Sequence, residues 1–137
     1  MKFNTLVLGI TITIASSSSL LASNGAELFE QKCAVCHLMT RPADRSSMIA
    51  PPAKGLMFHM GEDVGSDKKI LAHINDFVMN PTKEKAICPS VKRFGLMPSQ
   101  KENITKEELH TVAKWMIENL KMTPAQYERR KQRGSQR

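Results

Sequence analysis

The chain has 137 residues, which is enough for one domain and too few for two of ordinary size. Only 5% of the residues are aromatic, so a small core is expected to need extra buried contact from a metal, a disulfide or a cofactor. The formal net charge is +7, but much of the excess lies near the C-terminal end and no nucleic-acid-binding motif is present, which argues against a nucleic-acid-binding protein.

The first 22 residues have the pattern of a secretory signal peptide. A positively charged start, Met1-Lys2, precedes an apolar stretch from Phe3 to Ile14, and small residues follow up to Ala22. The apolar stretch is shorter than the roughly 20 residues of a membrane-spanning helix. We therefore expect cleavage after residues 1–22 and a mature protein in the periplasm.

Three helices are predicted along the rest of the chain. The first covers residues 25–37, and the second, an amphipathic helix, covers 66–80. The third begins with a capping-box pattern, Thr105 and Glu108, carries an apolar stripe and stops at Pro124. These patterns predict an all-α protein.

The segments between these helices are rich in proline and glycine. Residues 38–65 and 82–102 are therefore predicted to be irregular. Long irregular loops are unusual in a compact domain unless they wrap a ligand. No segment shows the sustained alternation of a β-strand, so no sheet is expected.

Cys33-Ala34-Val35-Cys36-His37 is a C-x-x-C-H motif, the attachment signature of a c-type haem. On a helix, two cysteines three residues apart share a face, so both thiols can form thioethers with one porphyrin while His37 binds the iron. A zinc site would need a second Cys/His pair, and a thioredoxin-like motif would need neighbouring strands. The sequence shows neither, and a disulfide between Cys33 and Cys36 would be strained on a helix. We therefore predict one covalently bound haem c.

Met97 is the predicted sixth ligand of the iron. It lies between Gly95, which permits an unusual turn, and Pro98, which restricts the backbone after the ligand. His59 is the main alternative. A His/Met ligand pair would raise the reduction potential relative to two histidines.

The chain resembles the class I c-type cytochromes, the bacterial monohaem cytochrome c family, through the C-x-x-C-H motif, the Pro51-Pro52 loop, the Met97 loop and the last helix. The resemblance implies three to four helices and long loops wrapped around the haem, in a domain over residues 23–122. It also implies that Gly25, Phe29 and Trp115 meet where the first and last helices cross.

The same resemblance implies residues around the haem. A carbonyl of Pro51 or Pro52 would accept a hydrogen bond from the axial histidine. Phe94 would lie in the pocket. The family often uses Tyr or Trp to hold the haem propionates, but here Trp115 is assigned to the helix crossing and Tyr127 lies in the tail. Arg93, Lys54 or backbone groups could hold the propionates instead, unless Arg93 and Lys54 are solvated surface charges.

The expected function is electron transfer between proteins, without an enzymatic reaction. The expected partners carry acidic docking surfaces or are membrane-bound, because residues 123–137 form a basic segment predicted to be a flexible tail. The alternative is a haem enzyme or sensor whose labile sixth position binds peroxide, NO or a sulfur compound. Cys88 is either a small buried side chain or a partner in an intermolecular disulfide.

Overall fold

A computed structural model describes residues 24–135 of the chain, and within this range it contains six helices and no strand. The all-α prediction is therefore confirmed. The predicted signal peptide, 1–22, lies outside the described residues. None of the described helices is long and apolar enough to cross a membrane. The helices are α1 Gly25–Lys32, α2 Ala53–Asp63, α3 Asp67–Met79, α4 Val91–Phe94, α5 Lys106–Leu120 and α6 Pro124–Ser135.

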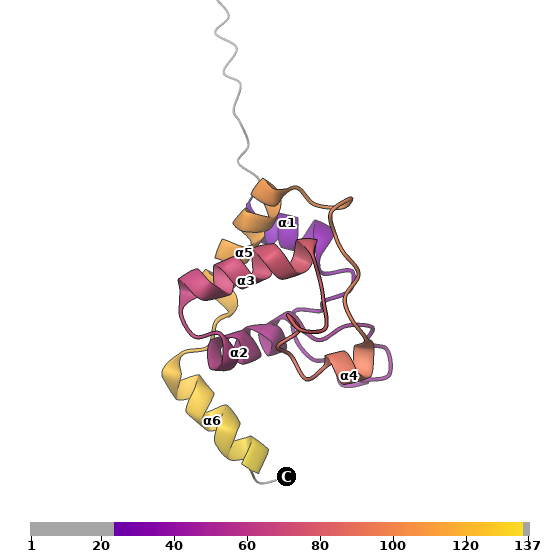
Figure 1. Cartoon of the computed structure of the whole chain (residues 1–137). Coiled ribbons are helices and arrows are strands. Elements are labelled where there is room, and N and C mark those ends of the chain that lie inside the picture. The colour runs from indigo at the N-terminus through magenta and orange to yellow at the C-terminus, as the bar shows by residue number, and fades with distance from the viewer. Residues whose placement is uncertain (1–23, 136–137) are drawn as a thin grey trace, which may run out of the picture.

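Helix α5 is the centre of the structure, because α1, α3 and α2 all pack against it (Figure 1). The helix runs in the predicted place and buries one apolar stripe. That stripe joins the main hydrophobic cluster, which also takes side chains from α1, α2 and α3. The buried residues of α5 are Leu109, Val112, Ala113, Met116 and Leu120.

A reciprocal pair of hydrogen bonds fixes the start of α5. The Glu108 N–H donates to the Thr105 hydroxyl over 3.1 Å, and the Thr105 N–H donates to the Glu108 carboxylate over 2.8 Å. This is the predicted capping box. It satisfies backbone donors that would otherwise lack a partner inside the helix.

We expect Thr105→Ala to lower the free energy of unfolding by about 1 kcal/mol, because the side-chain half of this cap is lost. Urea denaturation followed by far-ultraviolet circular dichroism measures the change. Thr40→Ala, at an exposed threonine in a loop, is the matched control and should be nearly neutral. Equal midpoints for Thr105→Ala and the parent protein would contradict this account of the cap.

Helices α1 and α5 approach closely at Gly25. A Cβ atom added at Gly25 would lie 2.4 Å from the Trp115 Cβ and 2.9 Å from the Thr111 carbonyl oxygen. One turn further on, the rings of Phe29 and Trp115 pack with their centroids 5.4 Å apart. Gly25, Phe29 and Trp115 therefore meet between the first helix and α5, as expected.

Helix α1 is shorter than predicted. It ends at Lys32, and residues 33–37 form turns instead of continuing the helix to His37. The Ala34 N–H donates to the Phe29 carbonyl over 2.9 Å. This bond spans five residues instead of the four of an α-helix, as is common at helix C-termini. The C-x-x-C-H motif thus begins at the C-cap of α1.

Helix α2 lies inside the segment that was predicted to be irregular, so that part of the prediction is wrong. Pro52 is the N-cap, where the missing N–H of a proline costs nothing. Gly55 and Gly61 each disfavour a helix by about 1 kcal/mol, but burial of Ala53, Met57, Phe58 and Met60 outweighs that cost.

Two further helices lie in segments where the sequence predicted none. The short α4 interrupts residues 82–102. Helix α6 occupies most of the predicted flexible tail. Helix α5 ends at Leu120, before Pro124, and Pro124 opens α6. The Thr123 N–H donates to the Gln126 side chain over 2.8 Å in a capping-box arrangement.

Candidate functional site

The C-x-x-C-H motif and the Met97 loop line the same cavity. The cavity has a volume of about 250 Å³ and is bordered by the end of α1, by α2, by one face each of α3 and α5, and by the loop that carries α4. Cys33, Cys36, His37 and Met97 all contribute to its wall. The rest of the wall is mainly apolar and includes Phe29, Ile49, Leu56, Ile74, Phe77, Val78, Ile87, Val91, Phe94, Leu109, Val112 and Met116.

The His37 ring is held by one backbone carbonyl. Its Nδ1 lies 2.8 Å from the Pro51 oxygen. A carbonyl oxygen can only accept a hydrogen bond, so Nδ1 must carry the proton and the lone pair of the neutral ring lies on Nε2. The residue that orients the histidine is therefore Pro51, and the sequence had left Pro51 and Pro52 as alternatives.

The first turn of α2 positions that carbonyl. The Ala53 N–H donates to the Leu38 carbonyl over 2.8 Å, and the Lys54 N–H donates to the Met39 carbonyl over 3.3 Å. These donors have no partner within their own helix. By bonding to the two residues after His37, they hold the histidine beside Pro51.

The two cysteines of the motif are free thiols in the structure. Burial, and to a smaller extent the nearby Cys36, raises the pKa of Cys33 to about 11. A thiol-exchange protein needs a cysteine that ionises easily, with its pKa lowered by its surroundings. The environment of Cys33 does the opposite, which weighs against a thiol-redox role.

The Met97 loop is anchored to the end of α3. Gly95 has φ 77°, a left-handed conformation that favours glycine, and it turns the chain after α4. The Ser99 hydroxyl donates to the Met79 carbonyl over 2.7 Å, and the Gln100 N–H donates to the Val78 carbonyl over 3.0 Å. Met97 therefore lies only two residues before Ser99, which is fixed to the end of α3.

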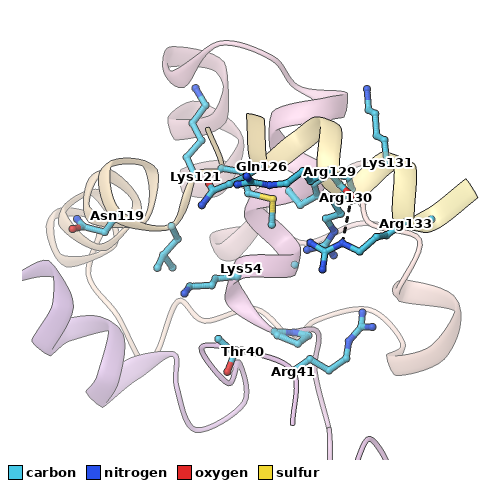
Figure 2. Close-up of a pocket in the computed structure, with 16 residues that line it drawn as sticks. Thr40, Arg41, Lys54, Asn119, Lys121, Gln126, Arg129, Arg130, Lys131 and Arg133 are labelled. Atoms are coloured by element: carbon cyan, nitrogen blue, oxygen red, sulfur yellow. Dashed lines mark hydrogen bonds between the residues drawn. The ribbon is translucent and has the colours of Figure 1, made fainter. Parts of the chain in front are cut away.

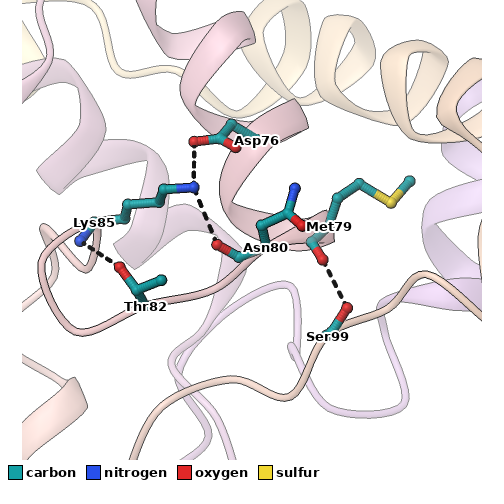
Figure 3. A network of polar contacts seen from close by, with 6 residues as sticks. All are labelled: Asp76, Met79, Asn80, Thr82, Lys85 and Ser99. Atoms are coloured by element: carbon teal, nitrogen blue, oxygen red, sulfur yellow. Dashed lines mark hydrogen bonds and ion pairs between the residues drawn. The ribbon is translucent and has the colours of Figure 1, made fainter.

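The other end of the same long loop is tied down as well (Figure 3). The Lys85 ammonium lies 2.7 Å from the Asp76 carboxylate and 3.2 Å from the Asn80 carbonyl. The Lys85 N–H donates to the Thr82 hydroxyl over 3.4 Å. Both ends of the loop are thus held at the C-terminal end of α3, and the residues between them line the cavity.

Four other side chains in the wall could bind a metal through sulfur or nitrogen: Met60, Met116, His73 and Cys88. His73 stacks on Phe77 with the ring centroids 5.6 Å apart. Burial is the largest effect on His73 and lowers its pKa, which favours the neutral ring. His59, the alternative weighed from the sequence, does not line the cavity and packs edge-on against Phe58.

Not every predicted pocket residue lines the cavity. Pro52, Trp115 and Arg93 do not. The Arg93 guanidinium donates to the Arg45 carbonyl over 2.7 Å and lies 4.8 Å from the centre of the Phe94 ring. Lys54 faces a different cavity.

Cys88 is a cavity residue that sequence reasoning did not place there. It is half-buried, lines the same wall, and its sulfur lies 2.8 Å from the Ser90 hydroxyl. No periodic pattern in residues 82–102 pointed to this position. Across residues 24–135, no three His, Cys, Asp or Glu side chains form a group that could hold a metal ion.

The chain is 23% identical over 129 residues to an uncharacterized protein of Aquifex aeolicus (strain VF5), a match that covers 83% of this chain and 85% of that protein. No family model and no solved structure matches the chain. The two proteins are thus similar along most of their lengths.

Proposed function

We propose that this protein is a one-electron carrier of the class I cytochrome c type, with a single haem held covalently by Cys33 and Cys36. The observation that carries the proposal is the convergence of the C-x-x-C-H motif and the Met97 loop on one apolar cavity. His37 and Met97 are 60 positions apart in the chain (97 − 37). A protein that binds haem iron from two sides needs this convergence.

The residues present fit a c-type haem. Both cysteine side chains reach the cavity as free thiols, so both can form thioethers. The hydrogen bond to Pro51 leaves Nε2 of His37 with its lone pair free for iron. Met97 supplies a thioether sulfur to the same cavity.

Exposed apolar residues at the cavity support a bound apolar group. Ile49 and Leu96 line the cavity, yet 66% and 37% of their surfaces are exposed. Val35, between the two cysteines, is 78% exposed. Large apolar side chains exposed at the mouth of an apolar cavity are suited to contact with a bound apolar group.

The haem would supply the one-electron chemistry, by cycling its iron between the ferric and ferrous states. The chain holds His37 in one tautomer, positions Met97 through the Ser99 anchor, and surrounds the iron site with apolar side chains that exclude water. These contributions favour a stable pair of ligands and an unreactive iron, as a carrier requires, and no substrate bond is made or broken.

The expected setting follows from the sequence. The proposed signal peptide would place the carrier in the periplasm, where its partners would be redox proteins that are acidic or membrane-bound. Removal of residues 1–22 takes away Lys2 and no acidic residue, so the mature chain would carry a net charge of +6 (19 − 13), which would speed the encounter with such partners at low salt.

The test is to express the full chain with haem-attachment machinery, purify it from the export compartment, and denature it in alkaline pyridine. We expect a haemochrome spectrum of the c type and a polypeptide mass increased by one haem. Cys33→Ala/Cys36→Ala is the matched control. It should lose the covalent haem because neither thioether can form.

A wild-type polypeptide that carries no added mass, from cells that attach haem to a known c-type cytochrome, would refute the proposal. A colourless protein with titratable Cys33 and Cys36 thiols would favour thiol chemistry instead.

A further inference from the structure

A second cavity lies on the other side of α2, bordered by α2, the end of α5 and α6 (Figure 2). Its volume is about 850 Å³. The start of α2 and the proline pair before it separate the two cavities, because Pro51 and Leu56 line the first cavity and Pro52 and Gly55 line the second. The second cavity is therefore distinct from the proposed haem site.

The wall of the second cavity is strongly basic. Seven of its lining residues are Arg or Lys, and none is Asp or Glu. Two of the seven have acidic partners, since Lys121 pairs with Asp67 and Lys131 lies 3.7 Å from Glu62. Among the described residues, the other five form no ion pair with a carboxylate: Arg41, Lys54, Arg129, Arg130 and Arg133.

Helix α6 is docked in a way that creates this cavity. The Tyr127 hydroxyl donates to the Phe58 carbonyl over 2.7 Å, and the Tyr127 ring stacks on Phe58 with centroids 5.1 Å apart. A Cβ atom at Gly61 would lie 1.6 Å from the Tyr127 oxygen, so only glycine permits this contact. The arginines of α6 are thus brought opposite Arg41 and Lys54 by specific packing.

The cationic side chains of the wall are close enough to affect one another electrostatically. The Arg130 guanidinium lies 4.2 Å from the centre of the Phe58 ring and is partly buried. Burial lowers the pKa of Arg130, the positive charge of Arg41 lowers it further, and Arg133 adds a smaller effect, while the Glu62 carboxylate opposes them. Positive charges gathered in this way repel one another unless an anion lies between them.

We propose that the cavity between α2 and α6 binds a small anion with two or more linked phosphate groups. Guanidinium groups match phosphate oxygens with paired hydrogen bonds. Arg41 from the loop, Lys54 from α2 and Arg129 from α6 approach the cavity from three segments, so a ligand with several charged groups would engage them together. The volume lies within the range of small-molecule sites, about 300–1,000 Å³.

The concave shape favours a small ligand over a bilayer or the surface of an acidic protein. A bilayer is flat and would contact the exposed edges of the basic residues, whereas a linked phosphate group can enter the cavity. Pro52, Phe58, Leu120 and Met122 add apolar surface to the lining, and an apolar wall beside the charges strengthens their attraction to an anion. This site does not depend on the proposed haem.

The test is isothermal titration of the purified protein, in the form in which it is isolated, with tripolyphosphate, pyrophosphate and orthophosphate. We expect saturable binding of tripolyphosphate at one site and weaker binding of orthophosphate. Arg41→Gln/Arg129→Gln should weaken tripolyphosphate binding roughly tenfold for each side chain removed. Lys101→Gln/Lys114→Gln is the matched control, because it removes the same charge from exposed positions outside the cavity.

Gly61→Ala provides a test of shape at constant charge. It should displace α6 through Tyr127 and weaken binding, while far-ultraviolet circular dichroism checks that the protein stays folded. The proposal would be overturned if Gly61→Ala bound tripolyphosphate as tightly as the parent protein. It would also be overturned if the two charge variants lost the same amount of affinity, because the binding would then be non-specific attraction between charges. An absence of saturable binding would overturn it as well, as would binding only to phosphatidylglycerol vesicles, which would indicate a membrane surface instead.

Discussion

Met97→Leu is expected to abolish the weak near-infrared absorption band of the oxidised, haem-loaded protein, because that band arises from sulfur bound to ferric iron. Leucine keeps the apolar volume of methionine but cannot bind a metal. The reduction potential should fall by on the order of 0.1 V or more, since a thioether ligand favours ferrous iron and axial ligands help set haem potentials over about 0.8 V. Optical spectroscopy and a redox titration measure both effects.

Met60→Leu is the matched control, because Met60 lines the same cavity and the substitution removes the same thioether group. We expect its band and potential to stay close to those of the parent protein. If the band survived in Met97→Leu and vanished in Met60→Leu, the ligand would be Met60. If the parent protein itself lacked the band and were high-spin, the sixth position would be open, as expected of a haem enzyme or sensor.

Gly25→Ala is expected to lower the free energy of unfolding by about 1–3 kcal/mol, because it overpacks the contact between α1 and α5. The added Cβ would lie 2.4 Å from the Trp115 Cβ and 2.9 Å from the Thr111 carbonyl oxygen. Neither atom is the free end of a flexible side chain, so the two helices must move apart. Urea denaturation of the haem-loaded protein measures the loss.

Gly55→Ala is the control for this substitution, since Gly55 lies within α2 and a Cβ there would meet only the Pro52 Cδ, at 3.9 Å. Alanine should be neutral or stabilising there, by up to about 1 kcal/mol, through its higher helix propensity. A Gly25→Ala protein as stable as the parent would show that the close approach of α1 and α5 is not required.

Sequence patterns were sufficient to predict α3 and α5 but not α2 or α6. Helices α3 and α5 were predictable because each carries an amphipathic stripe, and α5 also has a capping box. Helix α2 was missed because Gly55 and Gly61 disfavour a helix locally, and only burial of Met57 and Phe58 against the rest of the protein compensates.

Helix α6 was missed although its start carries a local pattern. Thr123, Pro124 and Gln126 have the spacing of a capping box with proline at the first helical position. The basic composition of the segment suggested a solvated tail. The contact of Tyr127 with Phe58 and Gly61, which no local pattern encodes, holds the helix on α2.

The sequence by itself determined the helical class and the C-x-x-C-H motif, because amphipathic periodicity and the spacing of reactive groups are local properties of a chain. Tertiary structure alone decided that Pro51, and not Pro52, orients His37, that Met97 reaches the same cavity, and that α6 places arginines opposite Arg41. Each of these depends on contacts between distant segments, which form only when the burial of apolar surface brings those segments together.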